Sequence, residues 1–446
     1  MSSTKTLATF GDPTQRSTAL ALDAADQLAA YREQFVITNP DLCYLDGNSL
    51  GRLPKATIER VSNFVLNEWG TELVDGWAHW IDEAQVAGDL LGRAVLGAAA
   101  GQVLVCDTTS VNFYQLCVAA IRARPGRKTV IIDASNFPTD RYILQGIADQ
   151  FGLNLVTLNN DGSGGPNSGN HRTVDVDADC EMITAEMLAP LLNDDVALVT
   201  FQAIHYRSGS RPNIKAITDL VRSHGGLVVW DASHAAGAIE LDFDANGVDL
   251  AVGCTYKYGN AGPGSPAWLY VRKSLQAELR VPIQGWFAQD DQFVMGPIFE
   301  PNHEIRGFQI ASPSIIGIRG VQASFEMIEA ATIEAIAAKA ALGTDMMVAL
   351  FDAWLAPLGF TLLTPRDSSL RGGHITIGHP EAKRIAAALR KFANVVPDYR
   401  VPDSIRLAIA PLPTSFIEVW DGFARIRDSV AAQDYLKIQD NGSRVT

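Results

Sequence analysis

Six short apolar runs alternate with amphipathic stretches between residues 54 and 275 of this 446-residue chain. Strands that alternate with helices at this spacing favour an α/β fold with a mostly parallel sheet and helices on both faces. In such sheets, ligands bind beyond the carboxyl ends of the strands. The alternation therefore predicts both a fold class and the edge at which a site should lie. The runs are KTVIIDAS (128–135), LNLVTLN (153–159), DVALVTF (195–201), GLVVWDAS (226–233), VDLAVGCT (248–255) and AWLYVR (267–272).

The C-terminal part of the chain has a different pattern. Segment 316–352 predicts one long helix or a helix pair, and two strand-like runs (374–378 and 404–411) follow it with a helical run between them. This mixture favours a small α+β domain, and the chain length suits two domains. The Gly-, Ser- and Asn-rich stretch 159–171 predicts a surface excursion without chemistry. The predicted units are an N-terminal segment (1–53) that contributes to the small domain and to a loop of the site, a large domain (54–315) and a small C-terminal domain (316–446).

Charge and composition exclude several classes of function. A net charge of -14 and a sequence pI near 5.0 argue against a nucleic-acid or anionic-membrane surface, although a small anion needs only a local basic pocket. Residues 1–17 lack the pattern of a secretory signal, and no apolar run approaches ~18 residues, so we expect a cytoplasmic protein. Five scattered cysteines without a C-x-x-C pair predict reduced thiols, with neither disulfides nor a metal site: Cys43, Cys106, Cys117, Cys180 and Cys254.

Polar residues follow several of the predicted strands. Loop polarity alone explains any one of these groups. Together they are predicted to converge, because parallel strands end at the same edge of a sheet. The groups are Ser135 to Asp140, His205 with Tyr206, Asp231 with His234, and Tyr256 with Lys257.

Lys257 stands between two tyrosines in GCTYKYGNAGPGS (253–265), directly after the apolar run VDLAVG. A desolvated lysine is a nucleophile that can form a Schiff base. Pyridoxal phosphate (PLP) fits this chemistry, because its aldehyde takes an amine and its ring nitrogen stays protonated beside a carboxylate such as Asp231. Taken alone, Lys257 could equally be a surface lysine with a buried stem. The glycines could form only a tight loop, since their spacing is not that of a dinucleotide fold or a P-loop.

The phosphate of such a cofactor requires hydroxyl and backbone N–H groups at a helix N-terminus. Thr109 and Ser110, which open the helical run VNFYQLCVAAIRA, are candidates, and Tyr256 could add a phenol donor. Helix capping is the competing explanation for the two hydroxyl residues.

Eight segments, taken together, carry a family resemblance: YLDGNSLGRLP (44–54), CDTTSVN (106–112), SNFPTDRY (135–142), WDASHAAGAIELD (230–242), GCTYKYGNAGPGS (253–265), GWF (285–287), RGGHITI (371–377) and SIRLAIAPLPTSF (404–416). They resemble kynureninase, a fold-type-I PLP enzyme of the class V aminotransferase type, and they span nearly the whole chain in the family's order. The YLDGNSLG and TYKYxNxGxGS motifs are the most specific. The resemblance implies a mostly parallel seven-stranded sheet in the large domain.

The resemblance also implies a role for each matching residue. Lys257 would form the internal Schiff base, Asp231 would contact the pyridine nitrogen, and Arg406 would bind the substrate carboxylate as a bidentate guanidinium. Tyr256 would act as a proton donor or relay. Further implied cofactor contacts are Thr109, Ser110, Phe137, Pro138, Thr139, Asp140 and His234, implied substrate contacts are Asn48 and Ser49, and Trp286 and Ser312 are implied to come from the neighbouring subunit of a homodimer.

The implied reaction is the PLP-dependent hydrolysis of the Cβ–Cγ bond of L-kynurenine, or of a substituted kynurenine such as 3-hydroxykynurenine, to an anthranilate and L-alanine. This would place the chain in tryptophan catabolism through the kynurenine pathway and in NAD biosynthesis. Ala288-Gln289 departs from the family's usual Gly-His and leaves the substrate open.

Three alternatives remain on the same scaffold: an aminotransferase, a decarboxylase, or a hydrolase of another γ-oxo amino acid. A cysteine desulfurase needs a cysteine late in the chain, and none follows Cys254. From another class, a cofactor-free scaffold protein is disfavoured because Lys257, Asp231, Tyr256 and Arg406 are all present.

Overall fold

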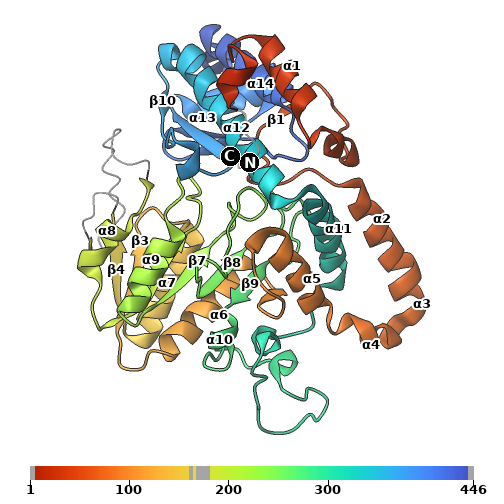
Figure 1. The fold of residues 1–446 in the computed structure, drawn as a ribbon, viewed down its shortest axis with the longest axis vertical. Helices are drawn as coiled ribbons and strands as arrows, with labels where there is room; N and C mark the ends of the chain where they lie inside the picture. Colours follow the sequence, from red (N-terminus) through yellow and green to blue (C-terminus); the bar gives the residue numbers. More distant parts are fainter. Residues whose placement is uncertain (1–5, 160–163, 167–180, 440–446) are drawn as a thin grey trace.

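The computed structural model describes residues 6–159, 164–166 and 181–439. Two large hydrophobic cores divide the described chain into two domains. Figure 1 shows the large domain, drawn from orange to teal, below the small domain, which combines the blue C-terminal part with the red N-terminal helix.

An eight-stranded mixed sheet forms the centre of the large domain. Its strands are β2 (Val103–Val105), β3 (Thr129–Asp133), β4 (Asn154–Leu158), β5 (Gly164–Pro166), β6 (Val196–Gln202), β7 (Leu227–Asp231), β8 (Leu250–Gly253) and β9 (Trp268–Val271). Their order across the sheet is β2-β9-β8-β7-β6-β3-β4-β5. Neighbours from β8 to β4 run parallel, whereas β9 is antiparallel to β8 and β2, and β5 is antiparallel to β4. Helices lie on both sides of this sheet (Figure 1), which is why its inner strands are continuously buried.

The predicted fold class is confirmed, since each of the six apolar runs contains one strand of this sheet. The predicted number of seven strands is wrong, because the described part of the sheet has eight. The edge strand β5 lies in segment 159–171, where we expected an irregular surface excursion. An edge strand needs only backbone pairing with one neighbour, so a glycine-rich segment can form it without any apolar signal. The remainder of that excursion, residues 160–163 and 167–171, lies outside the described residues.

The helices that flank the sheet begin where the sequence places their caps. The Thr108 side chain caps α6 (Thr109–Arg122) by accepting from the backbone N–H of Val111 at 3.3 Å. Asn213 caps α9 (Ile214–Ser223) in the same way. Pro138 stands at the start of α7 (Pro138–Phe151), a position that needs no N–H donor. The other helices of the large domain are α2 (Lys55–Asn63), α3 (Gly70–Glu72), α4 (Trp77–Trp80), α5 (Glu83–Leu91), α8 (Ala185–Leu188), α10 (Lys273–Gln276) and α11 (Ile315–Ala331).

The small domain contains a four-stranded antiparallel sheet covered by helices, as predicted for a small α+β unit. Its strands, in sheet order, are β10 (Thr361–Leu362), β11 (His374–Gly378), β14 (Ser404–Ala408) and β13 (Asp398–Arg400). A separate parallel pair joins β1 (Cys43–Tyr44) to β12 (Val395–Val396). The helices are α1 (Arg16–Ala25), α12 (Ile333–Leu350), α13 (Ala382–Ala388) and α14 (Phe416–Ala431).

The two cores indicate where one domain ends and the other begins. Helix α11 packs on α2 and α5 and buries its apolar side chains in the core of the large domain, although we expected the small domain to begin at residue 316. Along α12, Ile336 belongs to the first core and Met346 to the second. We therefore propose that the division lies within α12. The N-terminal segment contributes to the small domain through α1, which packs on α14, and through β1.

Candidate active site

A cavity of about 320 Å³ lies where the carboxyl ends of the central strands face the small domain. Its floor comes from residues that follow β3, β7 and β8, and one wall comes from the hairpin of β13 and β14. The lining residues are Ser49, Thr109, Ser110, Phe137, Thr139, Asp140, Asp231, Ser233, His234, Tyr256, Lys257, Arg400 and Arg406. Eleven of these residues, all except Ser233 and Arg400, were predicted from the sequence and are thus brought to one place.

Lys257 projects into the cavity from the turn that follows β8. Its Nζ lies 2.9 Å from Nε2 of His234 and 5.9 Å from the ring centroid of Phe137. Burial, and next the nearby Lys257 charge, hold the pKa of His234 well below its usual range, so this imidazole is neutral. A neutral Nε2 can accept a hydrogen bond from Nζ of Lys257, which orients the amine in the cavity.

Two buried carboxyl groups, Asp231 and Asp140, lie on the same side of the cavity. Asp231 is the last residue of β7, and its Oδ1 accepts from the backbone N–H of Ser233 at 2.8 Å. Burial, and next the charge of Asp231, raise the pKa of Asp140 well above its ordinary value. Asp140 therefore keeps its proton and can donate a hydrogen bond to the side chain of Asp231.

Hydroxyl groups line the part of the cavity next to the N-terminus of α6. Because Thr108 is the residue that caps this helix, the competing explanation of Thr109 and Ser110 as caps is not needed. Both hydroxyl side chains line the cavity instead, beside the free backbone N–H groups of the first helical turn. The charge of Cys254, and then burial, raise the pKa of Tyr256, so its phenol keeps its proton and can donate.

These groups fit PLP. An amine, a carboxylate and a set of hydroxyl and N–H donors line one cavity, and they match the aldehyde, the ring nitrogen and the phosphate of the cofactor. Two buried polar atoms of the site, Oδ2 of Asp140 and Nδ1 of His234, have no hydrogen-bond partner among the described residues. Buried polar atoms are normally paired, so their lack of a partner indicates a polar ligand or ordered water at this place.

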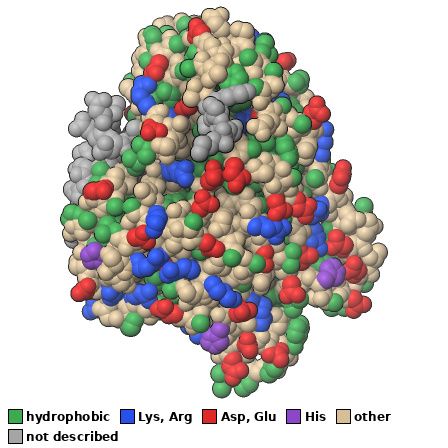
Figure 2. Space-filling view, in the orientation of Figure 1, with side chains coloured by type: hydrophobic (Ala, Val, Ile, Leu, Met, Phe, Trp, Pro, Cys, Tyr) green, Lys and Arg blue, Asp and Glu red, His purple; other side chains and the backbone are tan. Residues whose placement is uncertain are grey.

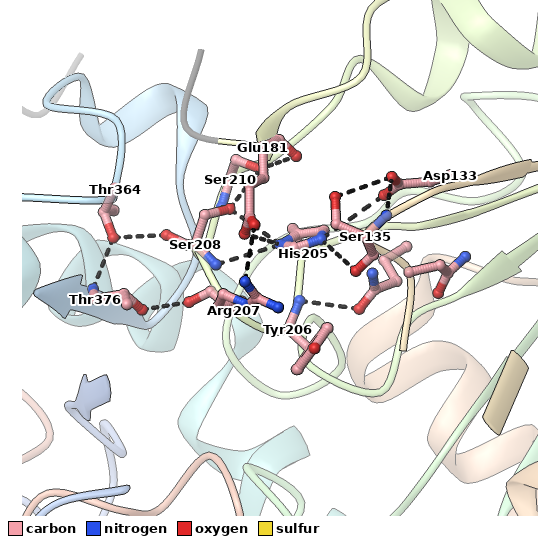
Figure 3. Close-up of polar contacts among 12 residues, drawn as sticks. Asp133, Ser135, Glu181, His205, Tyr206, Arg207, Ser208, Ser210, Thr364 and Thr376 are labelled. Atoms are coloured by element: carbon pink, nitrogen blue, oxygen red, sulfur yellow. Dashed lines mark hydrogen bonds and ion pairs between the residues drawn. The ribbon is translucent and has the colours of Figure 1, made fainter. Parts of the chain in front are cut away.

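Phe137 is held in the cavity wall by Tyr206, whose ring meets it edge-on at a centroid distance of 5.3 Å. The segment that carries Tyr206 is fixed from several sides, as Figure 3 shows. His205 contacts the backbone O of Ser135 at 2.9 Å through Nε2, and its Nδ1 lies 3.3 Å from Oε2 of Glu181. Two small-domain threonines also hold this segment: Thr364 donates to the backbone O of Ser208 at 2.6 Å, and Thr376 donates to that of Arg207. His205 thus supports the cavity wall and does not line the cavity.

Arg406 lies on β14 with only 1% of its surface exposed. It is ion-paired to Asp398, and it donates to the backbone O of Tyr206 and to Oγ of Ser49, the latter at 3.0 Å. These contacts fix the guanidinium at the small-domain wall of the cavity, on the side opposite the sheet.

Four predicted site residues do not line the cavity of the single chain. Pro138 serves as the first residue of α7, and Asn48 is fully buried with neither side-chain polar atom paired to a described residue. Trp286 is 44% exposed, and Ser312 is also at the surface. Ala288 is buried in the same short helical turn as Trp286, outside the cavity.

Two lining residues, Ser233 and Arg400, were not predicted. Ser233 lies between Asp231 and His234, so its position in the motif D-x-S-H was a usable signal. Arg400 follows Asp398 at the two-residue spacing of a strand, which places both side chains on one face. That strand is short and polar, and it gave no apolar pattern to recognise.

Several features are absent from the described parts of the chain. Residues 6–159, 164–166 and 181–439 contain no cluster of three or more metal-ligating side chains and no helix long and apolar enough to cross a membrane. Acidic and basic side chains are interspersed over the face in Figure 2. Four cysteines are buried free thiols (Cys43, Cys106, Cys117 and Cys254), and Cys180 lies outside the described residues.

Comparison with known proteins places this cavity in a family. The Kynureninase C-terminal domain family matches residues 336–426, and the Aminotransferase class-V family matches residues 43–377. The kynureninase of Pseudomonas fluorescens is 35% identical over 416 residues, which cover 92% of this chain and 94% of that protein. The kynureninase of Burkholderia pseudomallei (strain K96243) is 36% identical, over 93% of this chain and 95% of that protein. The chain belongs to the kynureninase family. The family predicted from the eight segments is therefore confirmed.

Solved structures with low sequence identity share the fold. A cysteine desulfurase from Thermococcus onnurineus NA1 superposes with a TM-score of 0.72 at 16% identity, covering 91% of this chain and 97% of that one. A C-DES protein with glycine covalently linked to its PLP cofactor has a TM-score of 0.72 at 18% identity, covering 89% of this chain and 99% of that one. The kynureninase family and its class V relatives are PLP enzymes, so the cofactor predicted from Lys257 and Asp231 is also confirmed.

Proposed function

We propose that this chain hydrolyses the Cβ–Cγ bond of L-kynurenine, or of a ring-substituted kynurenine, and releases an anthranilate and L-alanine. The observation that carries the proposal is the convergence of Lys257, Asp231 and Arg406 on one cavity in a chain of the kynureninase family. Bound PLP supplies an electron sink for the carbon skeleton of the substrate. The chain's own residues must bind, orient and exchange protons around it.

Lys257 is the residue we assign to the cofactor aldehyde and, once its amine is free, to the transfer of the substrate α-proton. His234 supports this exchange because its neutral Nε2 lies within hydrogen-bond reach of Nζ. Asp231 is assigned to the ring nitrogen, with protonated Asp140 as its hydrogen-bonding neighbour.

The other assignments follow from position. Phe137 faces the lysine and is assigned to the face of the cofactor ring. Thr109, Ser110 and the phenol of Tyr256 are assigned to the phosphate, and Thr139 and Asp140 to the same cofactor-facing wall. Arg406 and Ser49 are assigned to the α-carboxylate of the substrate, and Asn48, whose buried amide has no partner among the described residues, is assigned to the same substrate.

We also propose a homodimer in which a second copy completes the site. Trp286 and Ser312 do not reach the cavity of their own chain, and the loop around Trp286 projects from the large domain (Figure 1). Exposed apolar side chains on one segment are typical of a protein–protein interface. In this loop they are Ile283, Trp286, Phe293, Val294, Met295 and Ile298, each at least 42% exposed.

Complementation tests this dimer. A Lys257→Ala variant and a Trp286→Ala variant are each expected to be impaired as homodimers. If Trp286 acts in the partner's site, a mixed dimer holds one site with both residues intact, so refolding an equal mixture should restore about a quarter of the wild-type activity. Activity that stays at the sum of the two single variants, or a monomer by light scattering, would contradict the arrangement.

The reaction itself is tested with a panel of kynurenine analogues, scored by anthranilate fluorescence and by alanine release. Alanine release without any α-keto acid is expected, whereas an aminotransferase would require the keto acid and a decarboxylase would release CO₂. We propose a cytoplasmic location and a place in tryptophan catabolism by the kynurenine pathway, upstream of NAD biosynthesis. Failure of every kynurenine in the panel would refute the proposed function.

A further inference from the structure

Two arginines meet at one carboxylate oxygen in the small-domain wall of the cavity. Nε of Arg400 lies 3.0 Å from Oδ2 of Asp398, and the same oxygen accepts from Nε and Nη2 of Arg406. The strand register explains the meeting, because Asp398 on β13 pairs directly with Arg406 on β14, and Arg400 follows two residues later on the same face. Both arginines line the cavity.

The donors of Arg406 are mostly engaged already. A guanidinium has five N–H groups. Those of Arg406 contact Asp398 twice, the backbone O of Tyr206 once and Oγ of Ser49 once. One N–H on Nη1 is left, so Arg406 alone cannot offer a ligand two parallel hydrogen bonds without giving up one of these contacts.

Arg400 is in the opposite situation. It uses only Nε, and its two Nη groups form no hydrogen bond or ion pair with any residue in the described ranges. Its side chain is 27% exposed, compared with 1% for Arg406. The free donors at this corner of the cavity therefore belong mainly to Arg400.

The net charge at this corner of the cavity also indicates that Arg400 is the residue available to an anionic ligand. Asp398 is 2% exposed and in contact with both guanidinium groups, so the trio carries a formal charge of about +1. Without Arg400, the buried Arg406–Asp398 pair would be neutral. The attraction for an anionic ligand at this corner thus depends on Arg400, although Arg406 is the better buried residue.

We propose that Arg400 binds the α-carboxylate of the substrate together with Arg406, each guanidinium donating to one carboxylate oxygen, while Asp398 positions both. This inference rests on the proposed function, since it assigns a further substrate-binding residue to the same site. It predicts that the chain selects amino acids over the corresponding amines through a pair of arginines.

The test compares ligands that differ only in the carboxylate, using the PLP-loaded enzyme. Arg400→Gln is expected to raise the KM for L-kynurenine and the Kd for L-alanine, read from cofactor absorbance, by about ten- to a hundred-fold, the loss expected for a charged hydrogen bond. The aminoketone that lacks the carboxylate should bind wild type and variant within about two-fold of each other. Arg400→Lys, which keeps the charge, should recover part of the loss.

Arg390→Gln is the matched control, because Arg390 is another small-domain arginine that contacts an aspartate, Asp46 at 3.8 Å, but does not line the cavity. It should leave both ligands unaffected. Equal weakening of both ligands by Arg400→Gln would show a merely structural role, and an unchanged Kd for L-alanine would also overturn the proposal. The wild-type enzyme is assayed separately for alanine release from kynurenine, so failure of the proposed function would be distinguished from failure of this assignment.

Discussion

Gly51, the last residue of the YLDGNSLG motif, lies against the turn that carries Lys257. Its backbone N–H donates to the backbone O of Tyr256 at 2.8 Å. A Cβ at this position would lie 2.5 Å from the backbone O of Lys257 and 2.7 Å from Cα of Asn260. Ordinary contact begins near 3.4 Å, so Gly51→Ala must separate the two backbones by about 1 Å.

The expected effect follows from that separation. Overpacking and the lost hydrogen bond together should destabilise the fold by about 2–4 kcal/mol. A displacement of this size at the lysine should also lower kcat by roughly 10²-fold, because Nζ leaves its position relative to His234 and the cofactor. Thermal unfolding and kcat by anthranilate fluorescence measure the two effects.

Gly146→Ala is the matched control for this substitution. Gly146 lies on the exposed face of α7, and a Cβ there would meet nothing within 4 Å. Alanine should stabilise this helix by up to about 1 kcal/mol, without any change in kcat. Wild-type kcat and stability in Gly51→Ala would refute the steric reasoning.

Three further predictions follow from the site. Lys257→Ala should abolish turnover and the borohydride-stable attachment of PLP, while thermal unfolding of the cofactor-free protein stays unchanged. Turnover at the wild-type rate in this variant would contradict the role assigned to Lys257. Burial, and next the charge of Asp398, raise the pKa of Asp46 from 3.8 to about 6. Asp46 therefore holds its proton more tightly in the folded state than in the unfolded state, and its ionisation destabilises the fold as pH rises from about 4 to about 6. Asp46→Asn should therefore gain stability over wild type across that window, by on the order of 2 kcal/mol above pH 6, and a stability difference that is constant with pH would contradict the assignment. Phe137→Ala should weaken PLP binding about ten-fold or more through loss of the aromatic face, with the Kd measured by cofactor fluorescence, and unchanged affinity would place the ring elsewhere.

The fold and the floor of the cavity were predictable because their signals are local. Runs such as LVVWD are buried on both faces of a parallel sheet, so they are continuously apolar and stand out from their surroundings. Asp231 ends β7, Lys257 follows β8, and these strands are neighbours, so the rule about carboxyl ends is sufficient to bring the two side chains to one edge.

The small-domain wall could not be predicted in the same way. Arg400 reaches the cavity through the pairing of β13 with β14 and through the packing of one domain on the other. Neither leaves a periodic pattern in the three residues of β13. The proposed shift of the domain boundary from residue 316 into α12 has a related cause, since the apolar face of a helix such as α11 does not indicate which of two cores it packs into. Its assignment depends on contacts with α2 and α5, more than 220 residues earlier in the chain.

The loop formed by residues 46–51 connects the two halves of the site, and this connection has a consequence for specificity. Ser49 contacts Arg406 on the small domain, and Gly51 contacts the Tyr256 backbone on the large domain, so one short loop sets the spacing between the guanidinium and the lysine amine. A substrate must span that spacing between its carboxylate and its α-amino group. Changes in this loop should therefore alter cofactor and carboxylate binding together, whereas changes at Arg400 should alter only carboxylate binding. At Gly51 the loop lies too close to the backbone of Lys257 and Asn260 for a Cβ to fit, which explains why a glycine stands at its end.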